Sequence, residues 1–196
     1  MSEVNHVLVT QQFPEVEWEE KNSCFIVPSE KATEVVTWLK EHPAFRLDYL
    51  SCVSGADYLD SEVKTKEKNE DGKMEVTITQ VPAKMEAVYH FFSIEKKTGP
   101  VLLKQRCMDR DNPVVQSLTP IYRGAELMER EVYDLYGIHF TDHPDLRRIL
   151  MWPNFEHYPM RKDYVIPNDY DYEPTPHDEV IERARERRAQ LEGGSM

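Results

Sequence analysis

The sequence contains few cysteines, and they lie far apart. The three, Cys24, Cys52 and Cys107, form no C-x-x-C pair. An odd, scattered set is typical of reduced thiols, and it is too sparse for a disulfide framework or for an iron–sulfur cluster held by one chain. We therefore expect neither disulfides nor a cluster.

Long hydrophobic runs and an excess of positive charge are also missing. No apolar run approaches the roughly 20 residues that span a bilayer. The opening "MSEVNHVLVT" resembles neither a signal peptide nor an Arg-rich transit peptide. With 24 Lys and Arg against 36 Asp and Glu, the formal net charge is −12, which disfavours nucleic acid or anionic lipid as the main partner. We expect a soluble protein that is not secreted, from a bacterium or encoded by an organelle.

Common catalytic motifs are absent too. The sequence has no Gly-rich phosphate loop, nucleophile elbow or H-E-x-x-H. His139 and His143 have the spacing of two metal ligands on a helix, but they lie between Gly137 and Pro144, which disfavour a helix there. We expect structural or interface histidines rather than ligands.

The chain is long enough for one ordinary domain with an extension, because it has 196 residues of which 40% are hydrophobic. Its periodicity predicts an α+β fold: an antiparallel or mixed sheet packed with helices, followed by an extended C-terminal tail. Gly99 is expected at a tight hairpin, and residues 60–73 at a solvated hairpin tip. The expected helices span 6–13 and 30–42, the latter with Ser29 as N-cap, and the expected strands span 15–20, 24–28, 45–58, 86–96 and 100–108.

The second half of the chain is expected to begin with helices. Pro113 is placed as the first residue of a short helix, and residues 125–136 predict a longer one that ends at Gly137. Six prolines from Pro144 to Pro176, among many aromatic residues, then favour an extended path, and Thr175 caps a final helix. The predicted parts are an α+β domain over 1–110, a helical segment over 111–150 packed on it, and a partner-wrapping tail over 151–196.

Glu131 is the unusual residue of the longer helix. On a helical wheel it projects between Leu127 and Leu135, inside the apolar arc, whereas Glu126, Arg130 and Asp134 share the opposite arc. A carboxylate buried in that arc needs a cation, and Arg147 or Arg148 could provide it if the following segment folds back over the helix. The alternative is a general acid or base with a raised pKa.

Two stretches resemble a known family. "EREVYDLYGIHFTDHPDLRRILM", residues 129–151, and "HYPMRKDY", residues 157–164, are similar to the signature of the C subunit of the proton-pumping NADH:quinone oxidoreductase, respiratory complex I. His157 and Tyr158 depart from the Gly-His-Pro that is more usual in the family. The resemblance marks these residues as a structural or interface signature: Glu129, Arg130, Glu131, Asp134, His143, Arg147, Arg148, Arg161, Lys162 and Asp163.

The resemblance implies a non-redox subunit of the peripheral arm. Such a subunit binds no cofactor or metal, while NADH, FMN, iron–sulfur clusters and quinone belong to other subunits. Its partners would be the quinone-pocket subunit, lettered D, and the iron–sulfur subunit, lettered B, over which its tail would wrap. It would lie on the cytoplasmic side of the bacterial inner membrane and reach the membrane only through the complex, with no catalytic activity of its own.

Two other functions remain open from the sequence. The chain could be the equivalent subunit of a membrane-bound hydrogenase or formate-hydrogen-lyase complex. It could instead be a stand-alone hydrolase that uses His143 with Asp145 or Glu131. Genes for NADH-binding subunits beside this gene would favour complex I.

Overall fold

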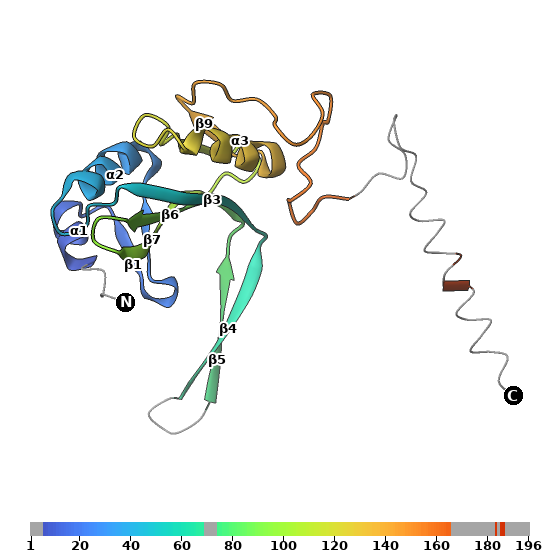
Figure 1. The fold of residues 1–196 in the computed structure, drawn as a ribbon. Coiled ribbons are helices and arrows are strands. Elements are labelled where there is room, and N and C mark those ends of the chain that lie inside the picture. The colour runs from blue at the N-terminus through green and yellow to red at the C-terminus, as the bar shows by residue number, and fades with distance from the viewer. Residues whose placement is uncertain (1–5, 69–73, 166–182, 184, 187–196) are drawn as a thin grey trace, which may run out of the picture. The chain divides into compact units, whose positions relative to one another are not determined.

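The computed structural model describes residues 6–68, 74–165, 183, 185 and 186 (Figure 1). The chain divides into two compact units, residues 1–162 and 163–196. The predicted final helix and its cap at Thr175 lie outside the described residues, apart from Arg183, Arg185 and Glu186, which are helical. The fold and the site below belong to the first unit.

A five-stranded mixed sheet forms the centre of the first unit. Its strand order is β1-β2-β7-β6-β3, and every neighbouring pair is antiparallel except the parallel pair β2 and β7. This sheet confirms the predicted α+β class. In that order, its strands are β1 (Glu17–Glu19), β2 (Cys24–Val27), β7 (Thr98–Cys107), β6 (Lys84–Ser93) and β3 (Tyr49–Tyr58).

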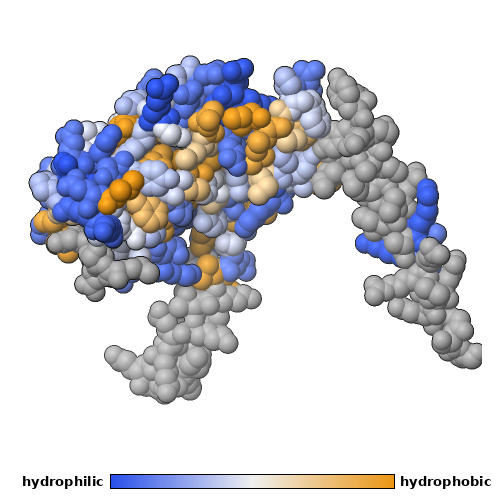
Figure 2. All heavy atoms as spheres, in the orientation of Figure 1, coloured by the Kyte–Doolittle hydropathy of each residue, from blue (hydrophilic) through white to orange (hydrophobic). Residues whose placement is uncertain are grey.

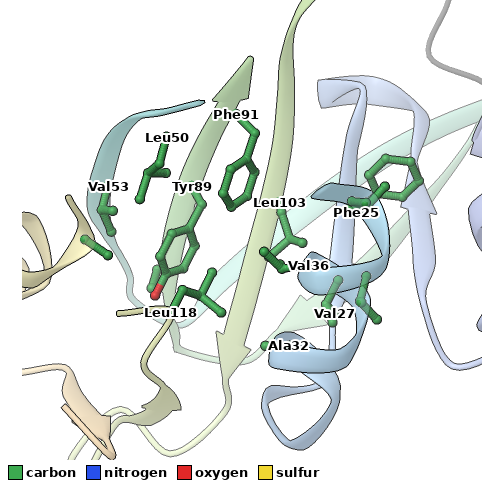
Figure 3. Packing of buried hydrophobic residues seen from close by; sticks show 14 of the residues in the cluster. Phe25, Val27, Ala32, Val36, Leu50, Val53, Tyr89, Phe91, Leu103 and Leu118 are labelled. Atoms are coloured by element: carbon green, nitrogen blue, oxygen red, sulfur yellow. The ribbon is translucent and has the colours of Figure 1, made fainter. Parts of the chain in front are cut away.

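Helices α1 (His6–Gln12), α2 (Ala32–Glu41) and α3 (Ala125–Tyr136) contribute to one hydrophobic core with the sheet. Figure 3 shows part of this core, with Ala32 and Val36 of α2 packed against the sheet. Alternation along β6 turns Tyr89 and Phe91 into this core, where both are fully buried. Helix α3 lies close against β3, because a Cβ at Gly55 would overlap the Tyr136 ring. Close packing at this point therefore fixes α3 on the sheet.

Two smaller strand pairs accompany the sheet. Strands β4 (Ser61–Lys68) and β5 (Met74–Val81) form an antiparallel ribbon. The prediction of a solvated hairpin tip over residues 60–73 is wrong for Ser61–Lys68, which pair with β5 as strand β4, and residues 69–73 lie outside the described residues. Strands β8 (Val114–Gln116) and β9 (His139–Thr141) pair in parallel beside α3.

Two predicted helix starts are wrong. Ser29 does not cap α2; it opens the 3₁₀ helix η2 (Ser29–Lys31), and its Oγ donates to Gln105 Oε1 at 2.9 Å. Pro113 begins no helix, because the residues after it form β8. In both cases contacts with residues distant in the sequence override a local start signal. Gly99 has the expected positive φ, +132°, but it lies inside β7, and the turn between β6 and β7 has its positive φ at Lys97. A second 3₁₀ helix, η1 (Glu20–Asn22), follows β1.

Candidate functional site

Helix α3 buries charged residues on two of its faces. Glu129 and Asp134 are fully buried and Arg130 is 8% exposed, whereas Glu131 is exposed. The prediction that Glu131 lies in the buried arc is therefore wrong. One face of α3, with Glu129, Ala125 and Val132, packs on the core. A second face, with Arg130 and Asp134, is covered by the segment that follows β9.

Glu129 is surrounded by hydrogen-bond donors. Its Oε1 accepts from the Leu118 backbone N–H at 2.8 Å and from Tyr89 Oη at 3.2 Å. Its Oε2 accepts from Ser117 Oγ at 2.6 Å and from Thr119 Oγ1 at 3.2 Å. Burial raises the pKa of Glu129 above its usual value, although the hydrogen bond from Ser117 opposes the rise. The cluster ties α3 to β6 and to the turn after β8.

A chain of polar contacts extends this cluster across the sheet. Gln105 Nε2 donates to Tyr89 Oη at 3.3 Å and to the Gln116 carbonyl at 2.8 Å. Gln105 Oε1 accepts from the Gln116 backbone N–H at 2.9 Å, in addition to the bond from Ser29. Burial also raises the pKa of Tyr89 well above its usual value. These polar groups satisfy one another's hydrogen bonds inside the core, so the cluster holds α3, β6, β7 and β8 in position.

Asp134 holds the segment that folds back over α3. Its Oδ1 accepts from Arg148 Nη1 at 2.7 Å. Its Oδ2 accepts from three consecutive backbone N–H groups, those of Ile149, Leu150 and Met151, at 2.7–2.9 Å. Burial alone would raise the pKa of Asp134, but the bonds from Met151 N–H and Arg148 hold it below its usual value. The predicted clamp therefore exists, with Asp134 in the place that Glu131 was expected to take.

Arg130 and Arg148 also donate hydrogen bonds to backbone carbonyl groups. Arg130 Nε donates to the Arg147 carbonyl at 3.1 Å, and its Nη2 donates to the Arg148 carbonyl at 3.3 Å. Arg148 Nη2 donates to the His157 carbonyl at 3.1 Å. The Arg147 side chain, in contrast, is 72% exposed and forms its ion pair with the exposed Asp145. Of these three arginines, Arg130 and Arg148 thus hold the segment on α3, whereas Arg147 lies on the surface.

His143 closes the start of this segment. Its Nδ1 accepts from the Asp145 backbone N–H at 3.1 Å, and its Nε2 lies 3.0 Å from the Glu126 carbonyl, to which it can donate. Both ring nitrogens are therefore occupied by backbone groups, so His143 has no free nitrogen to act as a base for Asp145 or Glu131. Among the described residues, no three His, Cys, Asp or Glu side chains gather as metal ligands.

The second motif packs on the end of α3. Gly137 ends the helix at φ +75°, and a Cβ there would lie 2.6 Å from the Tyr158 ring. That ring lies under the guanidinium groups of Arg148 and Arg161, with ring-centre distances of 5.1 and 4.8 Å. Arg161 Nε also donates to the Tyr136 carbonyl at 2.7 Å. Residues 157–161 therefore belong to the same structural cluster as the first motif.

A further carboxylate anchors the chain where the first unit ends. Asp57 on β3 forms a two-pronged pair with Arg110, at 2.7 and 2.8 Å. Its Oδ2 also accepts from the Lys162 backbone N–H at 2.8 Å. Sequence reasoning missed Asp57 and Arg110, since no local pattern joins residues 53 apart in sequence. Asp163, the last residue of the signature, begins the second unit.

The outward side of this region is hydrophobic. Figure 2 shows hydrophobic surface over α3 and the residues that follow it. We call this set of exposed residues the signature surface: Leu127 (57% exposed), Ile149 (40%), Leu150 (60%), Trp152 (39%) and Met160 (52%). The buried charges of the signature, Glu129, Arg130 and Asp134, are thus paired or hydrogen-bonded on the inside, while Glu131, Arg147 and several large apolar side chains are exposed. That distribution suits protein contact. None of the helices that the structure describes is long and apolar enough to cross a membrane.

Several known proteins are similar in sequence to much of this chain. A family model described as the respiratory-chain NADH dehydrogenase, 30 Kd subunit, matches residues 25–170. The C 2 subunit of NADH-quinone oxidoreductase from Rhizobium etli is 38% identical over 142 residues, 72% of this chain and 64% of that protein. The C subunit of NADH-quinone oxidoreductase from Roseiflexus sp. is 35% identical over 144 residues, 74% of this chain and 70% of that protein. The chain spans less than two thirds of the Rhizobium protein's length. A solved structure of the trypsin-resistant fragment of Nqo5 has a TM-score of 0.47 and 22% identity, over 72% of this chain and 97% of that chain.

Proposed function

The chain belongs to the family of the respiratory-chain NADH dehydrogenase 30 kDa subunit, and we propose that it is a non-redox, structural subunit of a proton-translocating NADH:quinone oxidoreductase. In this role it supports electron transfer from NADH to quinone by assembly and carries no reaction itself. NADH, FMN, the iron–sulfur clusters and quinone are bound by other subunits of the complex.

One observation carries this proposal beyond the family match: the contrast between the inside and the outside of the signature. Glu129 has four donors and Asp134 has an arginine and three backbone N–H groups, so neither presents a free carboxylate to a substrate. The signature surface, by contrast, exposes large apolar side chains such as Leu127 and Leu150. Internal charges shape this region, and the apolar side chains make the contact.

The partners we propose are the quinone-pocket subunit and the iron–sulfur subunit, on the cytoplasmic side of the bacterial inner membrane. The signature surface contacts one of them. The partner-wrapping tail, residues 151–196, extends the contact, and the Asp57–Lys162 bond anchors it to β3 at the end of the first unit. The domain division at 110 and 150 remains part of this proposal, with residues 151–162 attached to α3 by bonds such as that from the Met160 N–H to the Leu135 carbonyl.

Purification of the tagged full-length chain from membranes tests the proposal. We expect it to bring down the quinone-pocket and iron–sulfur subunits in equal amounts, in a fraction that oxidises NADH with a quinone acceptor. If the fraction instead holds a hydrogenase large subunit and oxidises hydrogen but not NADH, the chain serves the related hydrogenase complex. If no other polypeptide accompanies the chain, the structural role in a complex is wrong.

A further inference from the structure

A groove with a volume of about 560 Å³ lies at the foot of the β4–β5 ribbon. Three connections meet there: Leu59 and Asp60 join β3 to β4, Pro82 and Ala83 join β5 to β6, and residues 108–111 follow β7. None of these residues belongs to the signature surface. The groove is therefore a separate feature of the first unit.

The walls of the groove are apolar and accessible. Met108 is 55% exposed and Leu59 is 41% exposed, and Pro82 is also exposed. A hollow with large exposed apolar side chains is a place where a partner side chain can bury surface. The groove can therefore hold the aliphatic part of a side chain from another molecule.

The rim of the groove is negatively charged and held in place. Asp60 Oδ1 accepts from the Ala83 backbone N–H at 2.8 Å, and Asp109 Oδ1 accepts from the backbone N–H groups of Asp111 and Asn112 at 3.1 and 3.0 Å. For the other oxygens of Asp60 and Asp109, and for the Asp111 carboxylate, the described part of the chain provides no hydrogen-bond donor or cation. Among the described residues, the rim thus holds two carboxylates fixed by backbone N–H groups, those of Asp60 and Asp109, and the exposed carboxylate of Asp111 beside them.

Arg110, the one cation among the described residues that line the groove, does not offset this charge. Arg110 is paired with Asp57, whose side chain is 1% exposed. The guanidinium is thus already matched by a buried carboxylate, and the rim retains the charge of its three aspartates. A ligand for this groove must therefore be positively charged at one end and aliphatic along its length.

Lysine has this chemistry, because its four-carbon stem lies along apolar surface while its ammonium group stays at the polar edge. We propose that the groove is a docking site for a lysine-bearing segment of another polypeptide. The stem lies on Leu59 and Met108, and the ammonium group contacts Asp60, Asp109 and Asp111. This contact rests on the proposed function only because it requires a partner chain. It gives the first unit a second contact surface besides the signature surface.

Zero-length carbodiimide coupling in membranes that contain the tagged full-length chain tests the proposal, since it joins a carboxylate only to an amine in direct contact. We expect mass spectrometry to find Asp60, Asp109 or Asp111 joined to a lysine of another polypeptide. The variant Asp60→Asn, Asp109→Asn, Asp111→Asn keeps each Oδ1 acceptor but cannot be coupled, so its readout is the amount of that polypeptide that copurifies with the uncoupled chain, which should fall at least tenfold. The matched variant Glu20→Gln, Glu30→Gln, Glu41→Gln removes three exposed charges elsewhere and should retain that polypeptide.

Coupling of the groove only to lysines of its own chain, or no coupling at all, would overturn the inference. An equal loss in both variants would also overturn it, because net charge rather than the groove would then be responsible. The outcomes separate this inference from the proposed function. If the quinone-pocket and iron–sulfur subunits copurify but the groove is not coupled, the proposed function holds and the docking site is wrong. If the groove is coupled to an unrelated polypeptide, the docking site holds and the proposed function is wrong.

Discussion

Asp134 and Arg148 form a buried ion pair, Oδ1 to Nη1 at 2.7 Å, that joins helix α3 to the segment folded over it. The Asp134 side chain is fully buried and that of Arg148 is 14% exposed. The same carboxylate gathers the N–H groups of residues 149–151. One buried side chain thus sets the path of the backbone that presents Ile149 and Leu150 to the outside.

Asp134→Asn should destabilise the protein by about 3 kcal/mol, because it leaves the Arg148 guanidinium without its charged partner and turns an amide toward backbone donors. Urea unfolding of the full-length chain measures the change. Glu131→Gln is the matched control on the same helix. Because Glu131 is exposed, this substitution should change the free energy of unfolding of the protein by less than about 0.5 kcal/mol. Equal effects of the two substitutions would contradict the inward pairing of Asp134.

The two buried carboxylates should give opposite pH dependences. The pKa of Asp134 is lowered in the folded state, so its stabilising contribution is present at neutral pH and is lost as the pH falls below 3.8, the ordinary value. The pKa of Glu129 is raised, so its contribution is largest below 4.5 and is lost as the pH rises through the folded-state value.

Free energies of unfolding measured from pH 3 to 8 test these signs. The difference between the wild type and Asp134→Asn should grow with rising pH, and the difference between the wild type and Glu129→Gln should shrink. Parallel curves for the two variants would show that one of the carboxylates has been assigned the wrong environment.

Gly137→Ala should cost about 2 kcal/mol or more. Alanine at φ +75° is strained, and its Cβ would press into the Tyr158 ring. Gly124→Ala is the control at the other end of α3, because a Cβ there meets no atom within 4 Å and its φ of −64° suits alanine. We expect Gly124→Ala to be neutral or to stabilise by up to about 1 kcal/mol in thermal melts. A harmless Gly137→Ala would mean that Tyr158 does not pack on the end of α3.

Much of the fold was predictable because its signals are local. The strands of the sheet, α2, and α3 with its end at Gly137 all follow from alternation, periodicity and glycine placement. The position of Glu131 was not predictable from α3 alone. A helical wheel separates apolar from polar residues, but the polar arc of α3 is buried by a second layer, residues 143–151, which the wheel does not contain.

The candidate site shows the same limit. The resemblance identified Asp134 and Arg148, but their pairing depends on the fold-back, and Glu129 depends on donors from Ser117 and Leu118. Asp57 and Arg110 carry no local signal, so only the folded chain shows that they anchor Lys162.

We propose that the signature surface joins this chain to its neighbours, and the substitution Leu150→Lys is the sharpest test of that contact. Leu150 is 60% exposed, and only its backbone N–H serves Asp134, so the isolated variant should melt within about 2 °C of the wild type. Ile94→Lys, at a site 65% exposed on the hairpin after β6, is the control.

The measurement is the amount of each variant in the purified membrane complex, together with the NADH:quinone reductase activity of that complex. We predict that Leu150→Lys lowers both about tenfold, as expected when one interface contact of about 1.4 kcal/mol is lost, and that Ile94→Lys leaves both unchanged. Normal assembly and activity with Leu150→Lys, or an equal loss with Ile94→Lys, would contradict the claim.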